Sequence, residues 1–349
     1  MYIIAADVGG TKTRFIYADA RDPHNVLFEA RYESAEFDSF EPLLKTFLHD
    51  SGSTAEQIDS LTLALPGLVN ADSARLTNLP WVIKKQSLKD TFGISKVLFM
   101  NDFQASVFGT GLLQAKDQII LNPGTLNPGA SNLDTLNLDT LNLRTGAQQK
   151  PKKNVTRVAV GAGTGLGVAW AQDDVSDDGQ LESRAFDTEG GHIDFAPVDE
   201  TQIRLLQFFL KRHGHVSYER ILSGEGLVSL YDFYTNGLTS KDKVTAEWVS
   251  TQAENNTGAA QALSLFVQIY GAYIGNIALL FKPKGGIYIT GGIAAKIVDK
   301  MQSEDFINAY LNKGRMRKLV EQISVYLVTD ERIGVLGAMS QAVKTQQVS

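Results

Sequence analysis

The chain has 349 residues, which is longer than one hydrophobic core usually grows, so we expect two domains. Hydrophobic residues make up 43% and charged residues 21%, values near globular averages that argue against a disordered chain or a membrane protein. The net charge of -6 provides no basic field for a polyanion, so a small molecule is a more natural partner than nucleic acid. The absence of cysteine excludes disulfides, thiolate nucleophiles and thiolate zinc sites.

The amino-terminal segment MYIIAADVGG has no basic region and no small-residue cleavage site. No apolar run approaches the roughly 20 residues that a spanning helix needs. We therefore expect a cytoplasmic protein with no membrane partner.

The first hundred residues predict an α/β layer, because strands are followed by alternating helices and strands. A helix is predicted at 37–50, and Pro66-Gly67 ends a strand. The predicted strands are 2–7, 13–20, 26–34, 61–65 and 97–100.

The segment of about 122–154 differs in composition from the rest of the chain, with imperfect TLN repeats and a basic end. We interpret it as an insertion that forms a surface loop. The alternative is that its repeated leucines line a small β-ladder.

The opening pattern returns after the insertion, with a strand, a glycine turn and two further strands at 156–160, 168–171 and 182–186. The segments DVGGTKTRF and VGAGTGLGVAW are therefore candidates for equivalent hairpins in two related halves. Beyond them we expect helical segments at 200–212 and 246–281, strands around GGIYITGG and at 324–328, and a closing helix at 333–344 with a face of small residues.

Three glycine-rich turns are candidate phosphate sites, because glycine lets backbone N–H groups approach a phosphate closely. They are 7–13, 161–167 and 285–292. In the first, Asp7 ends a strand and could hold the water shell of Mg²⁺, and Lys12 could add charge. The alternative for each turn is a tight hairpin with no ligand.

Two better-known phosphate motifs are excluded. No Gly-Lys dipeptide occurs, so there is no Walker A loop. The 161–167 turn is followed by a strand, whereas a dinucleotide fingerprint opens a helix.

Asp102 is the leading candidate for a catalytic carboxylate, because it follows an apolar strand and precedes a helix. Ligands collect at such strand ends in open α/β sheets. Asn101 offers a donor and an acceptor that suit a sugar hydroxyl. The alternative is that Asn101 or Asp102 only caps the following helix.

Three further polar residues could bind hydroxyl groups. Glu189 and His192 lie on the glycine turn EGGH, and Glu219 lies in HVSYERILSGEG. A carboxylate accepts from two hydroxyls in a fixed geometry. Alternatively, Glu219 is an ordinary helix-surface charge, and His192 stabilises its turn or binds a metal.

Nine motifs in order resemble the bacterial glucokinases of the hexokinase and actin-like ATPase superfamily, nearly from end to end. They are DVGGT, LALPG, TNLPW, NDF, VGAGTGLGVA, EGGHIDFAP, GHVSYERILSG, GGIYITGGI and a terminal helix that contains LGA. The resemblance implies an α/β fold, the two-domain actin-like ATPase (ribonuclease H-like) fold, with a cleft between domains. The small domain would be 1–112 plus about 330–349, and the large domain 113–329.

The resemblance implies an ATP-dependent glucokinase, which transfers the γ-phosphoryl group of ATP to the 6-hydroxyl of D-glucose at the first step of glycolysis. Asp102 would be the general base, the domains would close over the sugar, and Mg²⁺ would neutralise phosphate charge. A homodimer is also implied. Glucose contacts carry over to Asn101, Asp102, Glu189, His192 and Glu219. Nucleotide contacts carry over to Gly9, Gly10, Thr11, Gly163, Thr164, Gly165, Gly291 and Gly292.

Some features depart from the family pattern. Lys12 replaces the usual Asn, as in relatives that combine repressors, open reading frames and kinases. Those relatives have a cysteine-rich zinc motif, whereas this chain has DFAPVDETQ at that place. Phosphorylation of mannose, fructose or an N-acetylated amino sugar is an alternative function. A sugar-sensing regulator is disfavoured, because it would need a helix-turn-helix ahead of Asp7.

Overall fold

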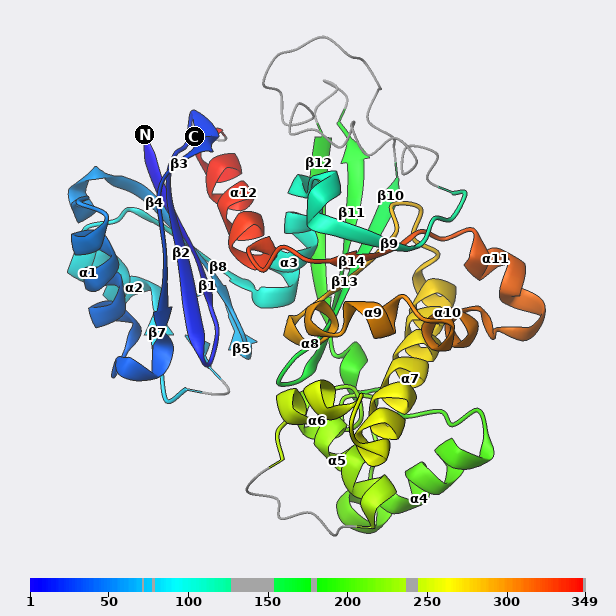
Figure 1. Cartoon of the computed structure of the whole chain (residues 1–349). Coiled ribbons are helices and arrows are strands. Elements are labelled where there is room, and N and C mark those ends of the chain that lie inside the picture. The colour runs from blue at the N-terminus through cyan, green and yellow to red at the C-terminus, as the bar shows by residue number, and fades with distance from the viewer. Residues whose placement is uncertain (71, 77–78, 127–153, 177–180, 237–243, 348–349) are drawn as a thin grey trace.

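The structure is a computed structural model that describes the chain except residues 71, 77–78, 127–153, 177–180, 237–243 and 348–349. It has two main β-sheets, with the helices α3 (Asp102–Gly109) and α12 (Ile333–Gln347) between them (Figure 1). Most of the predicted insertion, 127–153, lies outside the described residues. Its interpretation as a surface loop therefore stays a prediction.

The first sheet has five strands in the order β3-β2-β1-β4-β8. β1 pairs antiparallel with β2, and β4 and β8 extend the sheet in parallel to β1. The strands are β1 (Tyr2–Val8), β2 (Lys12–Asp19), β3 (Asp22–Glu33), β4 (Ile58–Leu65) and β8 (Lys96–Asn101). The predicted strands of this half are confirmed.

β1 is apolar from Ile3 to Ala6 because both faces of this sheet are covered. Ile4 and Ala6 belong to the core on the side of α1 (Phe40–Asp50). Ile3 and Ala5 belong to a second core, which α12 completes with Val335, Ala338 and Met339.

The second sheet has six strands in the order β12-β11-β10-β13-β14-β9. Its first five strands repeat the order and the directions of the first sheet, since β10 pairs antiparallel with β11 and parallel with β13. The two glycine turns therefore occupy equivalent hairpins, as the sequence indicated. The strands are β9 (Gln118–Asn122), β10 (Val155–Ala162), β11 (Leu166–Val175), β12 (Leu181–Thr188), β13 (Ile287–Thr290) and β14 (Val325–Val328).

A third, three-stranded sheet was not predicted. It consists of β5 (Leu68–Val69), β6 (Ser73–Arg75) and β7 (Val82–Lys84). These strands are too short to show an alternating pattern in sequence.

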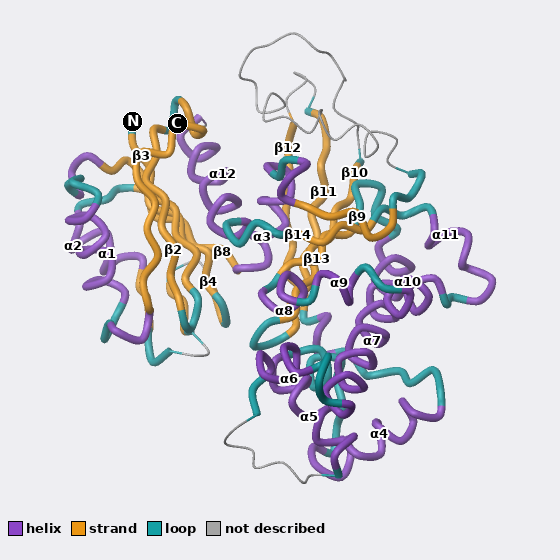
Figure 2. Tube along the Cα trace, in the orientation of Figure 1, coloured by secondary structure: helices purple, strands orange, loops and turns teal. Residues whose placement is uncertain are grey.

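The helices surround the second sheet and cover the outer face of the first (Figure 2). Besides α1, α3 and α12 they are α2 (Lys85–Phe92), α4 (Glu200–His213), α5 (Gly224–Thr235), α6 (Ala246–Gln252), α7 (Thr257–Phe281), α8 (Gly292–Lys296), α9 (Val298–Met301), α10 (Glu304–Leu311) and α11 (Arg317–Glu321). The predicted helical region 246–281 forms two helices, because Asn256 caps a new helix by accepting from the Ala259 N–H. Helices α5 and α8–α11 were missed.

Small residues let the two central helices approach each other closely. A Cβ on Gly337 of α12 would overlap the carbonyl oxygen of Ala105 in α3, and a Cβ on Gly109 would overlap that of Ile333. The small-residue face predicted for the closing helix is thus its contact with α3.

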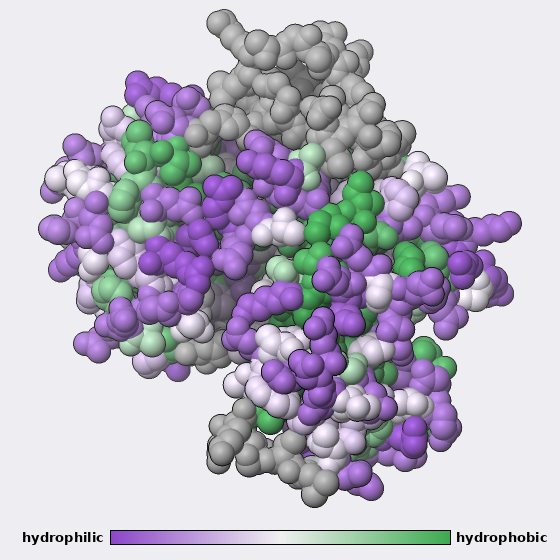
Figure 3. Space-filling view, in the orientation of Figure 1, coloured by the Kyte–Doolittle hydropathy of each residue, from purple (hydrophilic) through white to green (hydrophobic). Residues whose placement is uncertain are grey.

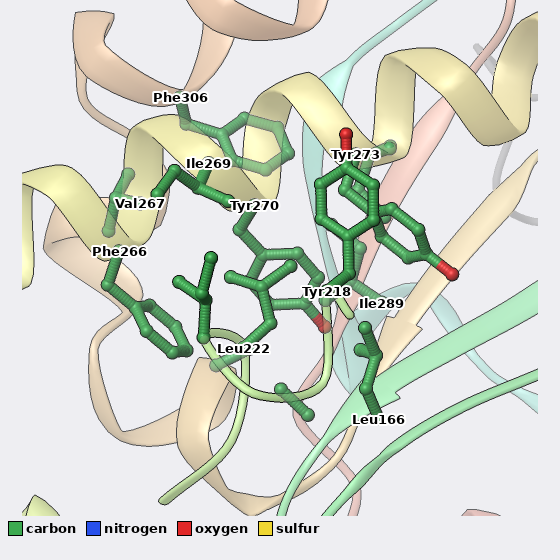
Figure 4. Close-up of a cluster of buried hydrophobic side chains, with 14 of the residues drawn as sticks. Leu166, Tyr218, Leu222, Phe266, Val267, Ile269, Tyr270, Tyr273, Ile289 and Phe306 are labelled. Atoms are coloured by element: carbon green, nitrogen blue, oxygen red, sulfur yellow. The ribbon is translucent and has the colours of Figure 1, made fainter. Parts of the chain in front are cut away.

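α7 is the core helix of the second half of the molecule. It is the one described helix that is long and apolar enough to cross a membrane, but 72% of its most apolar window is buried inside the structure. Phe266, Ile269 and Tyr270 lie in the cluster shown in Figure 4. Burial in the core accounts for the apolar composition of α7.

The face of the molecule in Figure 3 is mostly hydrophilic, with smaller apolar patches.

Candidate active site

A cavity of about 300 Å³ lies where the two sheets face each other. Asp7 and Asp102 line it from the first sheet, and Thr290, Gly291 and Gly292 line it from the second. The remaining wall is the end of β14 and the start of α12, including Asp330 and Gly334. Candidate residues from both halves of the sequence therefore meet at one site.

Asp102 lies at the carboxyl end of β8, as the first residue of α3. Its Oδ1 accepts a hydrogen bond of 3.0 Å from the Phe103 N–H. Burial and, to a smaller extent, the neighbouring carboxylate of Asp7 raise the pKa of Asp102 to about 7. A carboxylate with this pKa suits a general base at neutral pH.

Asp7 is the second carboxylate of the cavity. Burial raises its pKa to about 6, although Arg14 acts in the opposite direction. A Cβ on Gly334 would overlap the Asp7 carboxylate, so a larger residue at that point of α12 would displace the Asp7 side chain. Within the described residues Asp7 accepts no hydrogen bond and makes no ion pair, which leaves its oxygens available to a ligand.

Asn101 is the N-cap of α3. Its Oδ1 accepts hydrogen bonds from the N–H groups of Phe103 (2.8 Å) and Gln104 (3.2 Å). The helix-cap interpretation of Asn101 is therefore correct for its oxygen. The cap does not use the amide NH₂ group, so a substrate contact through that group is compatible with it.

Phe103 connects Asp102 to the second sheet. A Cβ on Gly167 would overlap the Phe103 ring, and one on Gly161 would lie 3.0 Å from it. Gly161 and Gly167 are partners across the β10–β11 hairpin. These two glycines thus make room for an aromatic ring, a role that the phosphate interpretation of the 161–167 turn did not foresee.

Glu189, His192 and Glu219 form one cluster. His192 Nε2 lies 3.7 Å from Glu189 Oε2 and 3.8 Å from Glu219 Oε1. Glu219 Oε2 accepts a hydrogen bond of 2.9 Å from the Leu166 N–H, next to the second glycine turn. Glu219 lies in a turn, so its interpretation as a helix-surface charge was wrong. No group of three His, Asp or Glu that could hold a metal occurs in the described part of the chain.

The carboxylate cluster is tied to the Asp102 segment. Gln104 Nε2 donates a hydrogen bond of 2.9 Å to Asp187 Oδ1 in β12, two residues before Glu189. The Asn101–Asp102 pair and the carboxylate cluster therefore lie next to elements, α3 and β12, that a hydrogen bond joins.

The two hairpin turns each use one glycine N–H group internally and leave later N–H groups free. Gly9 N–H donates to the Lys12 carbonyl and Gly163 N–H to the Gly165 carbonyl, both within their own turns. In the described structure the N–H groups of Gly10, Thr11 and Thr164 have no acceptor and remain available to phosphate. Lys12 lies 3.3 Å from Glu33 on β3, which gives its charge a partner outside the cavity.

Gly292 also lines a second, adjoining cavity of about 150 Å³. Its wall combines apolar residues of α5 and α8, such as Leu227 and Ile293, with Ser250 and the pair Lys296–Glu247 at 3.7 Å. Gly163 lines this cavity as well. An apolar slot with a few polar groups suits a flat heterocycle.

Sequence reasoning missed several residues of the main cavity: Ser106, Thr290, Asp330, Glu331 and Gly334. Thr290 stood inside a quoted motif but had no assigned role. The position of Gly334 could have been suspected from the small-residue face of the closing helix. The loop before α12 carried no signal of its own.

The glucokinase family model matches residues 4–345. The chain is 32% identical to a glucokinase of Nostoc punctiforme, covering 96% of this chain and 97% of that one. It is 31% identical to a glucokinase of Hahella chejuensis, covering 99% and 98%. The crystal structure of a glucokinase from an Antarctic psychrotroph has a TM-score of 0.76 at 26% identity, covering 98% of this chain and 99% of that chain. A glucokinase from Balamuthia mandrillaris in complex with glucose shares the fold, with a TM-score of 0.72 at 21% identity, covering 98% and 93%.

The repeated sheets, the cavity between them and the paired carboxylates define the class of sugar kinases with the two-domain actin-like ATPase fold. The fold expected from the sequence is therefore confirmed. Within this class, the chain belongs to the glucokinase family.

Proposed function

We propose that this protein transfers the γ-phosphoryl group of ATP to the 6-hydroxyl of D-glucose, giving glucose 6-phosphate and ADP. The observation that carries the proposal is the position of Asp102, in a cavity that also contains Asp7 and the 291–292 glycine turn. Membership of the glucokinase family supports the same reaction.

Asp102 would accept the proton of the 6-hydroxyl as the oxygen attacks the γ-phosphorus. Its Oδ1 is held by the helix N–H of Phe103, which leaves Oδ2 for the sugar. A raised pKa keeps the carboxylate basic enough to take the proton at neutral pH. The acceptor hydroxyl would thus be activated only when it is in line with the phosphate.

We propose that glucose is held by Asn101, Glu189, His192 and Glu219 in addition to Asp102. The support is that the described side chains of these residues lie on neighbouring elements, joined by the Gln104–Asp187 hydrogen bond. Carboxylates that accept from pairs of hydroxyls discriminate against analogues that lack one.

The nucleotide would lie across the glycine turns. Free N–H groups at Gly10, Thr11 and Thr164 suit its phosphates, and the 150 Å³ cavity beside Gly292 suits its adenine. Gly9, Gly163, Gly165 and Gly291 would contribute through the close backbone approach that their turns allow.

The residues present fit a Mg²⁺ ion held mainly by the nucleotide. Asp7 offers an unpaired, partly buried carboxylate, and with no cluster of three acidic or histidine ligands among the described residues, the phosphates and water would complete the coordination. Bound Mg²⁺ would neutralise charge on the transferring group. Asp7 would orient it through a water molecule.

We also propose the domain division 1–112 plus about 330–349 and 113–329, since each part contains one of the two main sheets. Closure of the two parts over the sugar would exclude water. A cytoplasmic location and a homodimer stay predictions.

A coupled assay tests the function directly. Asp102→Ala should lose about 10³-fold or more of the turnover while remaining folded, whereas Asp299→Ala, an exposed carboxylate outside the cavity, should keep it. If the Asp102 variant kept its activity, Asp102 would not be the general base. A panel of glucose, mannose, fructose and N-acetylglucosamine decides the sugar, and preference for another hexose would overturn the glucose assignment.

A further inference from the structure

A hydrogen-bonded chain leads from the Glu219 turn to the far side of α7. Asn276 Nδ2 donates to the hydroxyl of Tyr218 at 3.0 Å, and Lys313 Nζ donates to Asn276 Oδ1 at 2.7 Å. Lys313 also donates to the carbonyl of Ala272 at 2.8 Å. We call the hydrogen-bonded chain Lys313–Asn276–Tyr218 the relay. Lys313 follows α10 and lies outside the candidate active site.

The relay ends on the backbone that carries the candidate sugar ligands. Tyr218 directly precedes Glu219, whose N–H donates to the Gly191 carbonyl at 2.9 Å. The rings of Tyr218 and Tyr273 pack with their centroids 4.6 Å apart, and the Tyr273 hydroxyl donates to the Gly190 carbonyl at 2.8 Å. Figure 4 shows the two tyrosines together at the edge of the core cluster. Both the EGGH turn and the Glu219 turn therefore rest on side chains tied to α7.

The surrounding residues fix the position of the Lys313 side chain. This side chain passes over Gly275 of α7, where a Cβ would overlap its Cε atom. Lys313 is half-buried, and the two oxygens that accept from it are neutral, with no ion pair within the described residues. Holding an ammonium group against neutral acceptors costs desolvation, so a role in fixing geometry explains its presence better than a surface charge does.

Lys313 also lines a cavity of about 490 Å³ between α4, α7 and α10, away from the candidate active site. Asp305 in the same wall is held by Ser264 and Gln268, at 2.6 and 3.2 Å, and has no role in the relay. The cavity wall thus includes Lys313 and also Ala272, whose carbonyl accepts a hydrogen bond from Lys313.

We propose that Lys313 is a positioning residue for sugar binding, acting through Asn276 and Tyr218 on the turn that carries Glu219. The inference rests on the proposed function, because it assigns Glu219 to glucose. Loss of the Lys313 donor frees the Asn276 amide, leaves the Tyr218 hydroxyl with its backbone partner Ala196 but without a fixed Asn276, and lets Glu219 shift relative to His192. Affinity for glucose falls, while nucleotide binding at the other side of the cleft is unaffected.

Steady-state kinetics of the whole protein test the proposal, with the wild type assayed first for glucose phosphorylation. Lys313→Met should raise KM for glucose roughly tenfold and change KM for ATP less than about twofold. The reason is that removing one member of a hydrogen-bond network typically changes the free energy of binding by about as much as one or two hydrogen bonds contribute. Lys313→Arg should recover most of the affinity. The matched control is Lys300→Met, an exposed lysine outside both cavities.

A double-mutant cycle separates positioning from general stability. Tyr218→Phe keeps the ring and removes the end of the relay, so Lys313→Met should have little further effect on KM for glucose in that background. If Lys313→Met fails to fold, Tyr218→Phe alone must still raise KM for glucose selectively. The inference is overturned if Lys313→Met has the same KM for glucose as Lys300→Met, or if it raises KM for glucose and KM for ATP equally. It is also overturned if the effects of Lys313→Met and Tyr218→Phe on KM for glucose are fully additive. A wild type that does not phosphorylate glucose overturns the proposed function instead.

Discussion

The ring of Phe103 occupies the space that a side chain at Gly167 would need. Because Phe103 follows Asp102 directly, the position of the candidate base depends on the second sheet as well as on the first. This contact gives a steric test of how Asp102 is held.

Gly167→Ala should destabilise the protein by about 1–3 kcal/mol, because the added methyl group must displace the ring or the hairpin. Turnover should fall as well, since α3 moves with Phe103. Urea unfolding and the coupled assay measure the two effects. Gly163→Ala is the steric control for stability, because no atom lies within 4 Å of a Cβ there.

The ring itself can be reduced to check the cause. Phe103→Leu combined with Gly167→Ala should recover part of the lost stability, because the smaller side chain leaves room for the methyl group. A double variant that is less stable than Gly167→Ala alone would contradict the steric account.

Asp102→Asn should stabilise the unliganded protein at pH 8 more than at pH 5. The folded pKa of Asp102 is raised to about 7, above the ordinary value of 3.8, mainly by burial. The stability that this group contributes is therefore full below about pH 4 and is lost as the pH rises through 7. The gain at pH 8 should be on the order of 1–4 kcal/mol, and Asp7, which titrates in the same range, will broaden the transition.

Thermal unfolding across pH 5 to 8 measures this effect. Asp299→Asn, which removes an exposed carboxylate, should show no such pH-dependent gain. Equal changes in the two variants, or a larger gain for Asp102→Asn at pH 5, would be inconsistent with a raised pKa.

Glu219→Gln should raise KM for glucose by roughly 10- to 100-fold with little change in KM for ATP. The amide oxygen can still accept from the Leu166 N–H, so the turn should keep its conformation. The NH₂ group then replaces the oxygen that faces His192 and can no longer accept from a hydroxyl. Initial rates with glucose and ATP both varied give the two KM values. An unchanged KM for glucose would show that Glu219 does not bind the sugar.

Lys12→Asn should change KM for ATP less than about twofold. Lys12 and Glu33 form an exposed pair at 3.3 Å, and exposed pairs contribute about 0–1 kcal/mol, so stability should also change little. Initial rates at varied ATP test this. A fivefold or larger rise in KM for ATP would instead place the Lys12 charge on the phosphates.

The sequence by itself determined the strands of the first sheet, all strands of the second sheet except β9, and the residues that could perform the chemistry. The apolar run of β1 and the glycine-turn repeat each depend on local patterns, so the hairpins and their equivalence could be predicted. Asp102 could be placed at a strand end for the same reason. The short helices α8–α11 could not, because segments of four to eight residues carry too little periodicity.

Only the tertiary structure decided what each candidate residue contacts. Glycine signals a close approach without naming the partner, and the partner proved to be the Phe103 ring for Gly167 and the Asp7 carboxylate for Gly334. The raised pKa of Asp102 depends on burial and on Asp7, which lies 95 residues away in the sequence. The link from Lys313 to Tyr218 crosses three segments that are remote in the chain. Such contacts arise from packing between elements, and no local pattern in the sequence encodes them.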